Sequence, residues 1–404
     1  MSRVGLVTAL LPPVVGGTQM LVWRLFQGDP NLVVVSGMNE TVAFAGDGYS
    51  PLAAPTLDLP YPRLRGYRYG LAPALGAFSG IWLAAALVRV TRFLKSQGVD
   101  HVVSIPNAGP FALLGILAAH RLRIPHTLYI LDAWEEAAMG PIERAFVRLG
   151  LRFAARMPRS RLAVVSPALG GHYRSAFGFR DVTWIPNPAP LPTEPVTTSA
   201  KAEPFVLFTG TVKPFNITAL RCVARSIRRC KVIEKFVLTG HSSAPADSQG
   251  QRANDDDYLE SRHCSPAEVS SLQKRASVLL VATNVDDTSQ TSLGYLPGRL
   301  PEYVSTRRPI LLIGPQGSDA ARAIRHWRLG STTTTQDETT LAEMFDRLAL
   351  QGTSPEELAA HHDHDLFLEV FSRQEARRRL LGEPSAPLSS AAATLAAEFE
   401  QSLL

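Results

Sequence analysis

The sequence has few of the residues and patterns that mark several large protein classes. It contains three cysteines in 404 residues, and their spacing fits neither a disulfide framework nor a structural zinc site, so a reducing, cytoplasmic setting fits best. Its 29 glycines and 30 prolines follow no period, which excludes collagen-like and low-complexity arrays. With 45% hydrophobic and 19% charged residues, the chain is not intrinsically disordered.

Familiar functional signatures are also missing. There is no Gly-x-Gly-x-x-Gly dinucleotide fingerprint, no Gly-Lys-Ser/Thr phosphate loop and no Gly-x-Ser-x-Gly nucleophile elbow. No helix carries a dense Lys/Arg run interleaved with aromatic residues, which argues against nucleic acid as a partner. The first ten residues lack a basic region and a cleavage site, so they predict a strand rather than a signal peptide.

One long uncharged stretch bears on membrane contact. Residues 71–88 contain no charge and approach membrane-spanning length. They include Pro73 and run on into Arg89, Arg92 and Lys95, just before a predicted buried strand. We therefore predict a long core helix, with a membrane span as the alternative. A helix with Trp82 and a basic end also allows peripheral contact with a lipid surface.

Charge is divided unevenly along the chain. Residues 1–190 carry 18 basic and 10 acidic residues, whereas residues 191–404 carry 23 and 26. The asymmetry indicates two domains with different partners, the basic one facing an anionic ligand or the inner face of a membrane. The alternative is an arginine-rich surface that only contacts solvent.

Short apolar runs alternate with helical patterns throughout, which predicts βαβ units and parallel sheets. The proline- and threonine-rich run near residues 189–203 predicts a linker. The expected organisation is an α/β protein with two Rossmann-like, doubly wound domains that face each other across a cleft. It comprises an N-terminal domain (1–188), a C-terminal domain (204–384) and a final helix (385–404).

Two glycine-bearing loops follow predicted strands. Gly16, Gly17 and Thr18 follow the first strand, where glycine allows a ligand to approach backbone N–H groups at a helix N-terminus. In the second half, Gly210 ends a strand and Lys213 follows within reach of a phosphate. The alternative in each case is an ordinary tight turn.

The most specific stretch runs from residue 293 to residue 304. A loop with Gly298 opens a helix, so free N–H groups can bind a diphosphate, and Arg299 can add a charge-assisted hydrogen bond. Glu302 lies three residues later on the same face, where a carboxylate can bind both hydroxyls of a ribose. The alternative assigns Glu302 to the helix dipole alone.

Acidic and metal-binding candidates are fewer. Asp132 ends a predicted strand, where its carboxylate faces a cleft and can act on an acceptor hydroxyl, or else can cap a helix. The tract at residues 361–365 is rich in His and Asp, but consecutive residues do not converge on one ion. We therefore predict no metal site and no bound cofactor.

Taken in order, these stretches resemble the GT-B glycosyltransferases, specifically the retaining glycosyltransferase family 4, over most of the chain. Matching segments are Pro12-Pro13 with Gly16-Gly17, Leu131-Asp132-Ala133-Trp134, Ile185-Pro186-Asn187-Pro188, Phe208-Thr209-Gly210, and Pro297-Gly298-Arg299-Leu300-Pro301-Glu302-Tyr303 with Arg308-Pro309-Ile310. Three positions depart from the family pattern. Gly294 stands where the first glutamate of a Glu-x7-Glu pair is usual, Thr211 replaces an arginine and Leu131 replaces a histidine.

The resemblance implies transfer of a sugar from a nucleotide sugar, a UDP-sugar being favoured, to a hydroxyl acceptor with retention and without metal. It implies that Lys213, Arg299, Gly210 and Gly298 hold the diphosphate and that Glu302 holds the ribose. Gly16, Gly17, Thr18 and Asp132 would line the reaction centre, and the final helix (385–404) would pack back on the first domain. The acceptor would be a small molecule, a glycan or a lipid-linked precursor in surface-glycan biosynthesis. Alternatives are a catalytically degenerate nucleotide-binding scaffold and a nucleotide-sugar epimerase that uses Asp132, Glu135 or Glu136.

Overall fold

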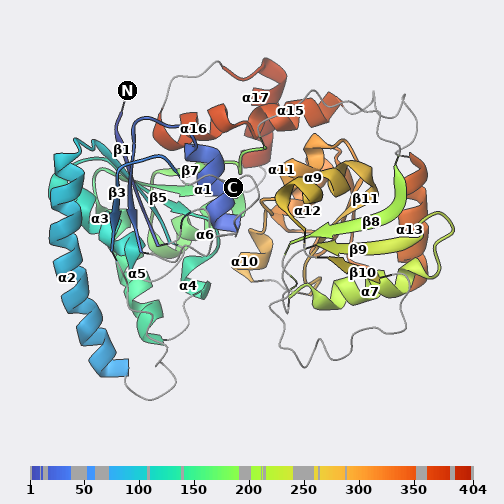
Figure 1. Cartoon of the computed structure of the whole chain (residues 1–404), viewed down its shortest axis with the longest axis horizontal. Coiled ribbons are helices and arrows are strands. Elements are labelled where there is room, and N and C mark those ends of the chain that lie inside the picture. The colour runs from blue at the N-terminus through green and yellow to red at the C-terminus, as the bar shows by residue number, and fades with distance from the viewer. Residues whose placement is uncertain are drawn as a thin grey trace. The chain divides into compact units, whose positions relative to one another are not determined.

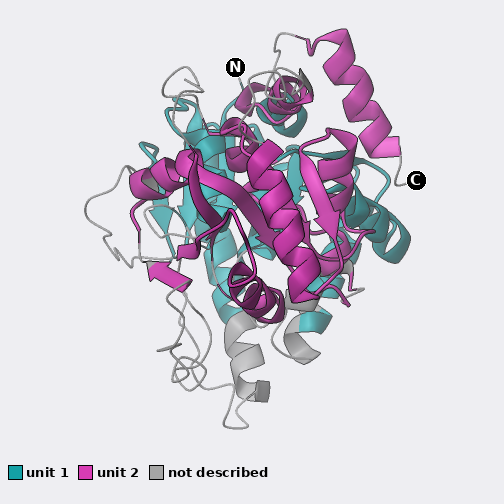
Figure 2. Ribbon diagram, turned by 90° about the vertical axis from the view of Figure 1, so that its right-hand side faces the viewer, with its two compact units in different colours: residues 1–186, 376–384 teal, residues 187–375, 385–404 magenta. Residues whose placement is uncertain are grey.

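The computed structural model describes residues 2–9, 11, 17–37, 52–59, 72–106, 110–137, 141–190, 202–210, 212, 215–239, 259–262, 264–286, 289–351, 362–382 and 387–401. Contacts divide the chain into two compact units (Figure 2). Unit 1 contains Met1–Pro186 and Ala376–Pro384, and unit 2 contains Asn187–Glu375 and Ser385–Leu404. Each unit is an α/β structure on one parallel sheet, as the alternation of strands and helices predicts.

The sheet of unit 1 has seven parallel strands in the order β3-β2-β1-β4-β5-β6-β7 (Figure 1). From β1 to β3 each new strand is added on one side of β1, and from β4 to β7 each is added on the other side. The reversal point of this sheet therefore lies between β1 and β4. The strands are β1 (Val4–Thr8), β2 (Leu32–Ser36), β3 (Thr56–Asp58), β4 (His101–Ile105), β5 (His126–Ile130), β6 (Ser160–Val164) and β7 (Val182–Trp184). Its helices are α1 (Gly17–Phe26), α2 (Ala72–Ser96), α3 (Phe111–Leu122), α4 (Trp134–Ala137), α5 (Pro141–Arg156) and α6 (Pro167–Phe177).

The sheet of unit 2 has six parallel strands in the order β10-β9-β8-β11-β12-β13, with its reversal between β8 and β11. The strands are β8 (Glu203–Thr209), β9 (Lys235–Thr239), β10 (Leu259–Arg262), β11 (Ala276–Ala282), β12 (Ile310–Ile313) and β13 (Gly330–Thr333). The helices are α7 (Ile217–Ile227), α9 (Pro266–Arg275), α10 (Gln290–Leu293), α11 (Leu300–Ser305), α12 (Asp319–His326), α13 (Glu338–Gln351), α15 (His362–Val370) and α17 (Ser390–Gln401).

The central strands form where the sequence has continuous apolar runs. Every residue of β1 and of β11 is buried, because helices cover both faces of a parallel sheet. The edge strands β3 and β13 have no such run, and most of their residues are exposed or half-buried. Because strands are predicted from apolar runs, the sequence does not indicate β3, β10 or β13.

Helix α16 (Arg373–Leu381) joins unit 1 near the end of the chain. Arg377 donates hydrogen bonds to Leu25 O and to Asp29 Oδ2, both at 2.9 Å. Arg161 donates to Leu380 O, and the Leu380 side chain is buried in the core of unit 1. The segment that groups with unit 1 is thus residues 376–384, whereas the sequence places the returning segment at 385–404.

The final helix α17 packs within unit 2 instead. The Trp327 ring lies 4.7 Å from that of Phe399 and 5.3 Å from that of Phe367, measured between centroids. His326 Nε2 also lies 2.8 Å from Leu395 O. Aromatic packing therefore holds α17 in unit 2. The apolar periodicity of the sequence predicts this helix but not the unit on which it packs. The division at Pro186 and Asn187 also precedes the predicted linker, and residues 191–201 of that linker lie outside the described residues.

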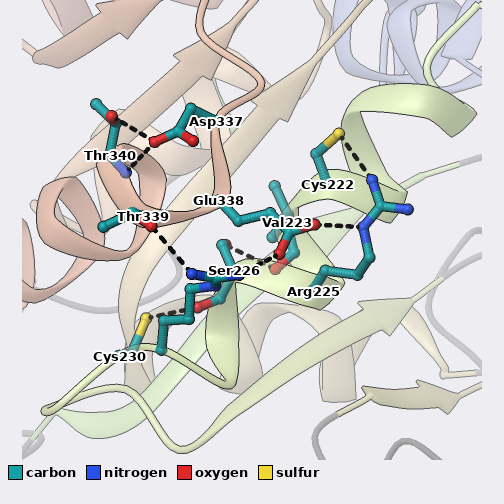
Figure 3. Close-up of polar contacts among 10 residues, drawn as sticks. Cys222, Val223, Arg225, Ser226, Cys230, Asp337, Glu338, Thr339 and Thr340 are labelled. Atoms are coloured by element: carbon teal, nitrogen blue, oxygen red, sulfur yellow. Dashed lines mark hydrogen bonds and ion pairs between the residues drawn. The ribbon is translucent and has the colours of Figure 1, made fainter.

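Ion pairs fasten helices to one another in unit 2. Figure 3 shows the Arg225 guanidinium beside the Glu338 carboxylate, and Arg225 Nε lies 2.7 Å from Glu338 Oε1. Arg229 Nη2 lies 3.4 Å from the other oxygen of the same carboxylate, and Arg229 Nη1 donates to Thr339 Oγ1 at 3.1 Å. These contacts hold α7 against the start of α13, and both helices pack in one core cluster with β8 and β11.

Candidate functional site

The carboxyl end of β8 lies at the reversal point of the second sheet, where doubly wound sheets bind ligands. Gly210 follows β8 with a φ of +121°, a region that side chains rarely adopt. A Cβ atom at this position would lie 2.3 Å from Arg299 Nη2, so only glycine leaves room for the guanidinium. Arg299 Cζ also lies 4.6 Å from the centre of the Phe208 ring, a cation–π distance.

Tyr303 holds α11 against this end of the sheet. Its buried hydroxyl accepts a hydrogen bond from Thr209 N at 3.0 Å and donates one to Leu280 O at 3.3 Å. Burial raises the pKa of Tyr303, so the phenol stays protonated. The ends of β8 and β11 are thereby tied to the helix that carries Arg299 and Glu302.

Glu302 lies on α11 with a partner from α9. Gln273 Nε2 donates to Glu302 Oε2 at 3.1 Å, and the Gln273 side chain is buried. An amide that holds one carboxylate oxygen fixes the direction of the group. Glu302 itself is half-buried, so a ligand can still reach it.

The loop before α11 is anchored on its inner side. Leu296 and Pro297 are buried, and Asn187 Nδ2 donates to Leu296 O at 3.3 Å. Gly298 is exposed. Asn187 belongs to the segment Ile185–Pro188, which resembles the glycosyltransferase family, and its side chain positions this loop.

Two buried polar atoms at this edge have no hydrogen-bond partner among the described residues. They are Arg299 Nη1 and the hydroxyl of Thr239, which ends the strand next to β8. A guanidinium nitrogen that is shielded from water and unpaired is an effective donor for an anion. This edge is therefore chemically suited to bind a phosphate-bearing ligand.

The structure brings some predicted residues together and leaves others apart. Gly210, Arg299 and Glu302 lie on adjoining elements at one edge of unit 2. Lys213 of the same predicted set lies outside the described residues, as does Gly16 of the loop in unit 1. Gly17 opens α1 and is exposed, and Thr18 after it is half-buried. Asp132 is exposed just beyond the carboxyl end of β5.

Glu135, a candidate carboxylate of the epimerase alternative, belongs to a polar cluster after β5 whose other members the sequence did not indicate. The Glu135 carboxylate is buried, with Oε1 at 2.5 Å from His172 Nε2 and Oε2 accepting from the Tyr173 hydroxyl at 2.6 Å. Burial alone would raise the pKa of Glu135, but the hydrogen bonds from His172 and Tyr173 outweigh it and lower that pKa. Glu135 and His172 are 37 positions apart, so only the fold brings them together.

Two further findings concern metal and membrane. Within the described part of the chain, no group of three or more His, Cys, Asp or Glu side chains is placed to hold a metal ion. Asp363 and Asp365 of the tract noted above pair with Arg328 and Arg307. Over the same residues, no helix combines the length and apolarity needed to cross a bilayer.

No protein-family model and no curated protein matches this sequence. Solved structures do match the fold. HepE from Anabaena, in complex with UDP and glucose, is 13% identical with a TM-score of 0.60, over 100% of this chain and 99% of that one. The chain has the GT-B glycosyltransferase fold.

Two other glycosyltransferase structures agree. A glycosyltransferase from Rickettsia africae is 10% identical with a TM-score of 0.63, over 94% of this chain and 97% of that one. The lipopolysaccharide outer core galactosyltransferase WaaB is 11% identical with a TM-score of 0.60, over 94% and 99%. Identities this low establish the fold, while the chemistry has to be argued from the residues of this chain.

Proposed function

We propose that this protein is a glycosyltransferase that moves a sugar from a nucleotide sugar, with a UDP-sugar favoured, to a hydroxyl acceptor. The observation that carries the proposal is the Arg299 guanidinium against Gly210 at the reversal point of the second sheet. A preorganised, water-shielded cation at that place stabilises the negative charge that develops on a leaving diphosphate.

The remaining roles are proposed from the resemblance of the sequence. Glu302, whose carboxylate is held by Gln273, accepts hydrogen bonds from the ribose hydroxyls. Gly210 and Gly298 allow phosphate oxygens to approach the backbone, and Lys213 adds a second cation. In unit 1 the resemblance proposes Gly16, Gly17, Thr18 and Asp132 as catalytic or acceptor-binding residues. Because the chemistry is mainly positioning and charge stabilisation, it needs no metal ion.

Similar folds support the class of substrate. The solved HepE contains UDP and glucose, and WaaB is named a galactosyltransferase of lipopolysaccharide. We extend to this chain a UDP-sugar donor and an acceptor in surface-glycan biosynthesis, with retention at the anomeric carbon. We also place the protein in the cytoplasm, at the inner face of the membrane.

The first test measures thermal unfolding of the purified protein with UDP, GDP, dTDP or CMP, each with and without EDTA. A nucleotide at a hundred times its dissociation constant stabilises the native state by about 2.7 kcal/mol. We expect stabilisation by UDP that persists in EDTA and is lost in Arg299→Gln and Glu302→Ala. Arg347→Gln, an exposed position on α13, is the matched control and should behave as wild type.

Two outcomes would count against the proposal. If no nucleotide stabilises the protein, the donor site is absent. If UDP binds but no UDP-sugar is hydrolysed or transferred, the protein is the degenerate scaffold that Gly294, in place of the usual glutamate, also allows. Where transfer occurs, the anomeric configuration of the product, read by NMR, decides between retention and inversion.

A further inference from the structure

One face of unit 1 combines unpaired cations with exposed apolar side chains. It consists of the outer faces of α2 and α5, and helix α3 contacts both of these helices. Three of the four large apolar side chains that are exposed within the described ranges lie here: Ile81 is 71% exposed, Val88 47% and Leu149 64%. We call these two helix faces, over residues 81–96 and 144–156, the α2/α5 face.

On α2 the exposed residues form a single stripe. Ile81, Val88, Arg92 and Lys95 are separated by seven, four and three positions, so they fall on one side of a helix with 3.6 residues per turn. The apolar members come first and the basic members occupy the last turns. From Ala72 to Ser96 the sequence contains no aspartate or glutamate.

On α5 the exposed residues are arginines spaced by four. Arg144, Arg148, Arg152 and Arg156 are all exposed, and residues four apart are neighbours along a helix surface. Leu149 lies three residues before Arg152, on the same side of the helix. The opposite side carries Val147, Leu151 and Ala154, which are buried in the core of unit 1.

Seven cations of this face have no carboxylate partner among the described residues. No hydrogen bond, ion pair or ring contact joins them to any residue that the structure describes. They are Arg89, Arg92, Lys95, Arg144, Arg148, Arg152 and Arg156. Like charges on two helices that both pack against α3 repel one another, which is tolerated on a solvated surface and relieved by an anionic partner.

We propose that the α2/α5 face docks on an anionic lipid bilayer, with the arginines and lysine at the phosphates and Ile81, Val88 and Leu149 in the headgroup layer. A bilayer fits better than a polynucleotide, because the exposed apolar side chains gain by leaving water and a nucleic-acid backbone offers them nothing. The helices lie on the surface and do not cross it. This inference deepens the proposed place at the inner face of the membrane and rests on that part of the proposed function, but not on the donor site of unit 2.

The test is flotation with vesicles of 30% phosphatidylglycerol in phosphatidylcholine, and with vesicles of phosphatidylcholine alone. The test variant combines Arg148→Gln, Arg152→Gln and Arg156→Gln. The matched control combines Arg221→Gln, Arg228→Gln and Arg347→Gln, three exposed positions of unit 2. Each basic residue near a charged surface contributes about five-fold in partitioning, so the test variant should bind on the order of 100-fold more weakly.

We expect the wild type and the control variant to float only with anionic vesicles, and raised salt to release them. A second variant, Ile81→Ser with Leu149→Ser, should weaken binding while leaving its salt dependence in place. Melting temperature and UDP stabilisation should be unchanged in both variants, which separates this test from that of the donor site.

Three results would overturn the proposal. The first is a wild-type protein that does not float with anionic vesicles. The second is equal loss of binding in the test and control variants, because net charge alone would then explain it. The third is binding of the wild type to a 20-base-pair RNA duplex, lost in the test variant, without binding to vesicles, which would make the face a nucleic-acid surface.

Discussion

The two units use their basic residues differently. In unit 2 most basic side chains with a described contact pair with a carboxylate. On the α2/α5 face of unit 1, seven cations have no carboxylate partner within the described part of the chain. The pairs of unit 2 are Arg225 and Arg229 with Glu338, Lys235 with Glu260, Arg275 with Glu203, Arg307 with Asp365, Arg322 with Asp319 and Arg328 with Asp363. The difference mirrors the excess of basic over acidic residues in 1–190.

Two arginines, one in each unit, depart from this difference in an informative way. In unit 2, Arg299 stacks on Phe208 and has an unpaired Nη1 among the described residues. In unit 1, Arg377 pairs with the buried Asp29 and fixes α16. An arginine that pairs with a carboxylate thus stabilises the fold, whereas one without such a partner among the described residues is available to a ligand or to another surface. Replacing a paired arginine should lower the free energy of unfolding, whereas replacing an unpaired one should mainly weaken ligand or vesicle binding.

The largest effect is expected at the buried pair of unit 1. Arg377→Gln leaves the Asp29 carboxylate, whose side chain is 4% exposed, without its cation. Loss of one partner of a buried pair costs about 3–5 kcal/mol. Urea unfolding should show this loss, and Asp29→Asn added to Arg377→Gln should recover part of it. A change below about 1 kcal/mol in the single variant would mean that α16 is not held by this pair.

The next effect depends on pH and also belongs to unit 1. Burial, with the nearby Arg161 cation, lowers the pKa of His101 to about 4, and burial next to His101 lowers that of His126 to about 3. Both are 6.5 in the unfolded chain, which therefore binds more protons below that pH.

The unfolding free energy should consequently fall as pH drops from 6.5 towards 4, by on the order of 3 kcal/mol for His101 alone. Unfolding measured across this range checks the slope. His101→Gln should flatten it, and His120→Gln, an exposed position on α3, should not. A slope that is the same in all three proteins would contradict the assignment to the buried histidines.

A smaller effect on stability separates two glycines. Gly210→Ala forces a side chain into φ +121° and displaces the Arg299 guanidinium. Gly178→Ala, at φ +78° after α6, meets no atom within 4 Å. Both changes should cost about 1–2 kcal/mol of stability through backbone strain. Only Gly210→Ala should also abolish stabilisation by UDP, and equal responses to UDP would remove the special role of Gly210.

The smallest effects on stability are expected at exposed arginines, where one with an ion pair can be compared with one without. Arg275 binds Glu203 through two hydrogen bonds of 2.6 and 2.8 Å, yet both side chains are more than 40% exposed. Arg275→Gln should cost up to about 1 kcal/mol at low salt, and less at high salt. Arg148→Gln, which removes no pair, should stay within about 0.5 kcal/mol. A larger loss for Arg148→Gln would show that it has a structural partner.

Much of the fold follows from local patterns. The helices at residues 167–177 and 266–275 begin with Ser-Pro, and Ser166 and Ser265 cap them through their hydroxyl groups, so the sequence predicts their bounds. Buried strands such as β2 and β11 are visible as apolar runs. The edge strands β3, β10 and β13 and the helix α13 are not, because exposed or half-buried segments lack that signal.

The candidate site was predictable only in part. The order of Gly210, Gly298, Arg299 and Glu302 along the chain indicates phosphate and ribose binding. That Gly210 accommodates the Arg299 guanidinium, that Gln273 fixes Glu302, and that Tyr303 ties α11 to two strands cannot be read from sequence. These contacts join residues 29 to 94 positions apart.

The sequence by itself therefore determined the doubly wound architecture, the unequal charge of the two halves and the residue types at the donor edge. These features can be predicted because apolar periodicity, turn residues and composition depend on residues that are close together in the sequence. The tertiary structure alone decided which arginines are paired and which are free, and which helix near the end of the chain joins unit 1. Pairing and burial depend on residues that only folding brings together, so no local pattern encodes them.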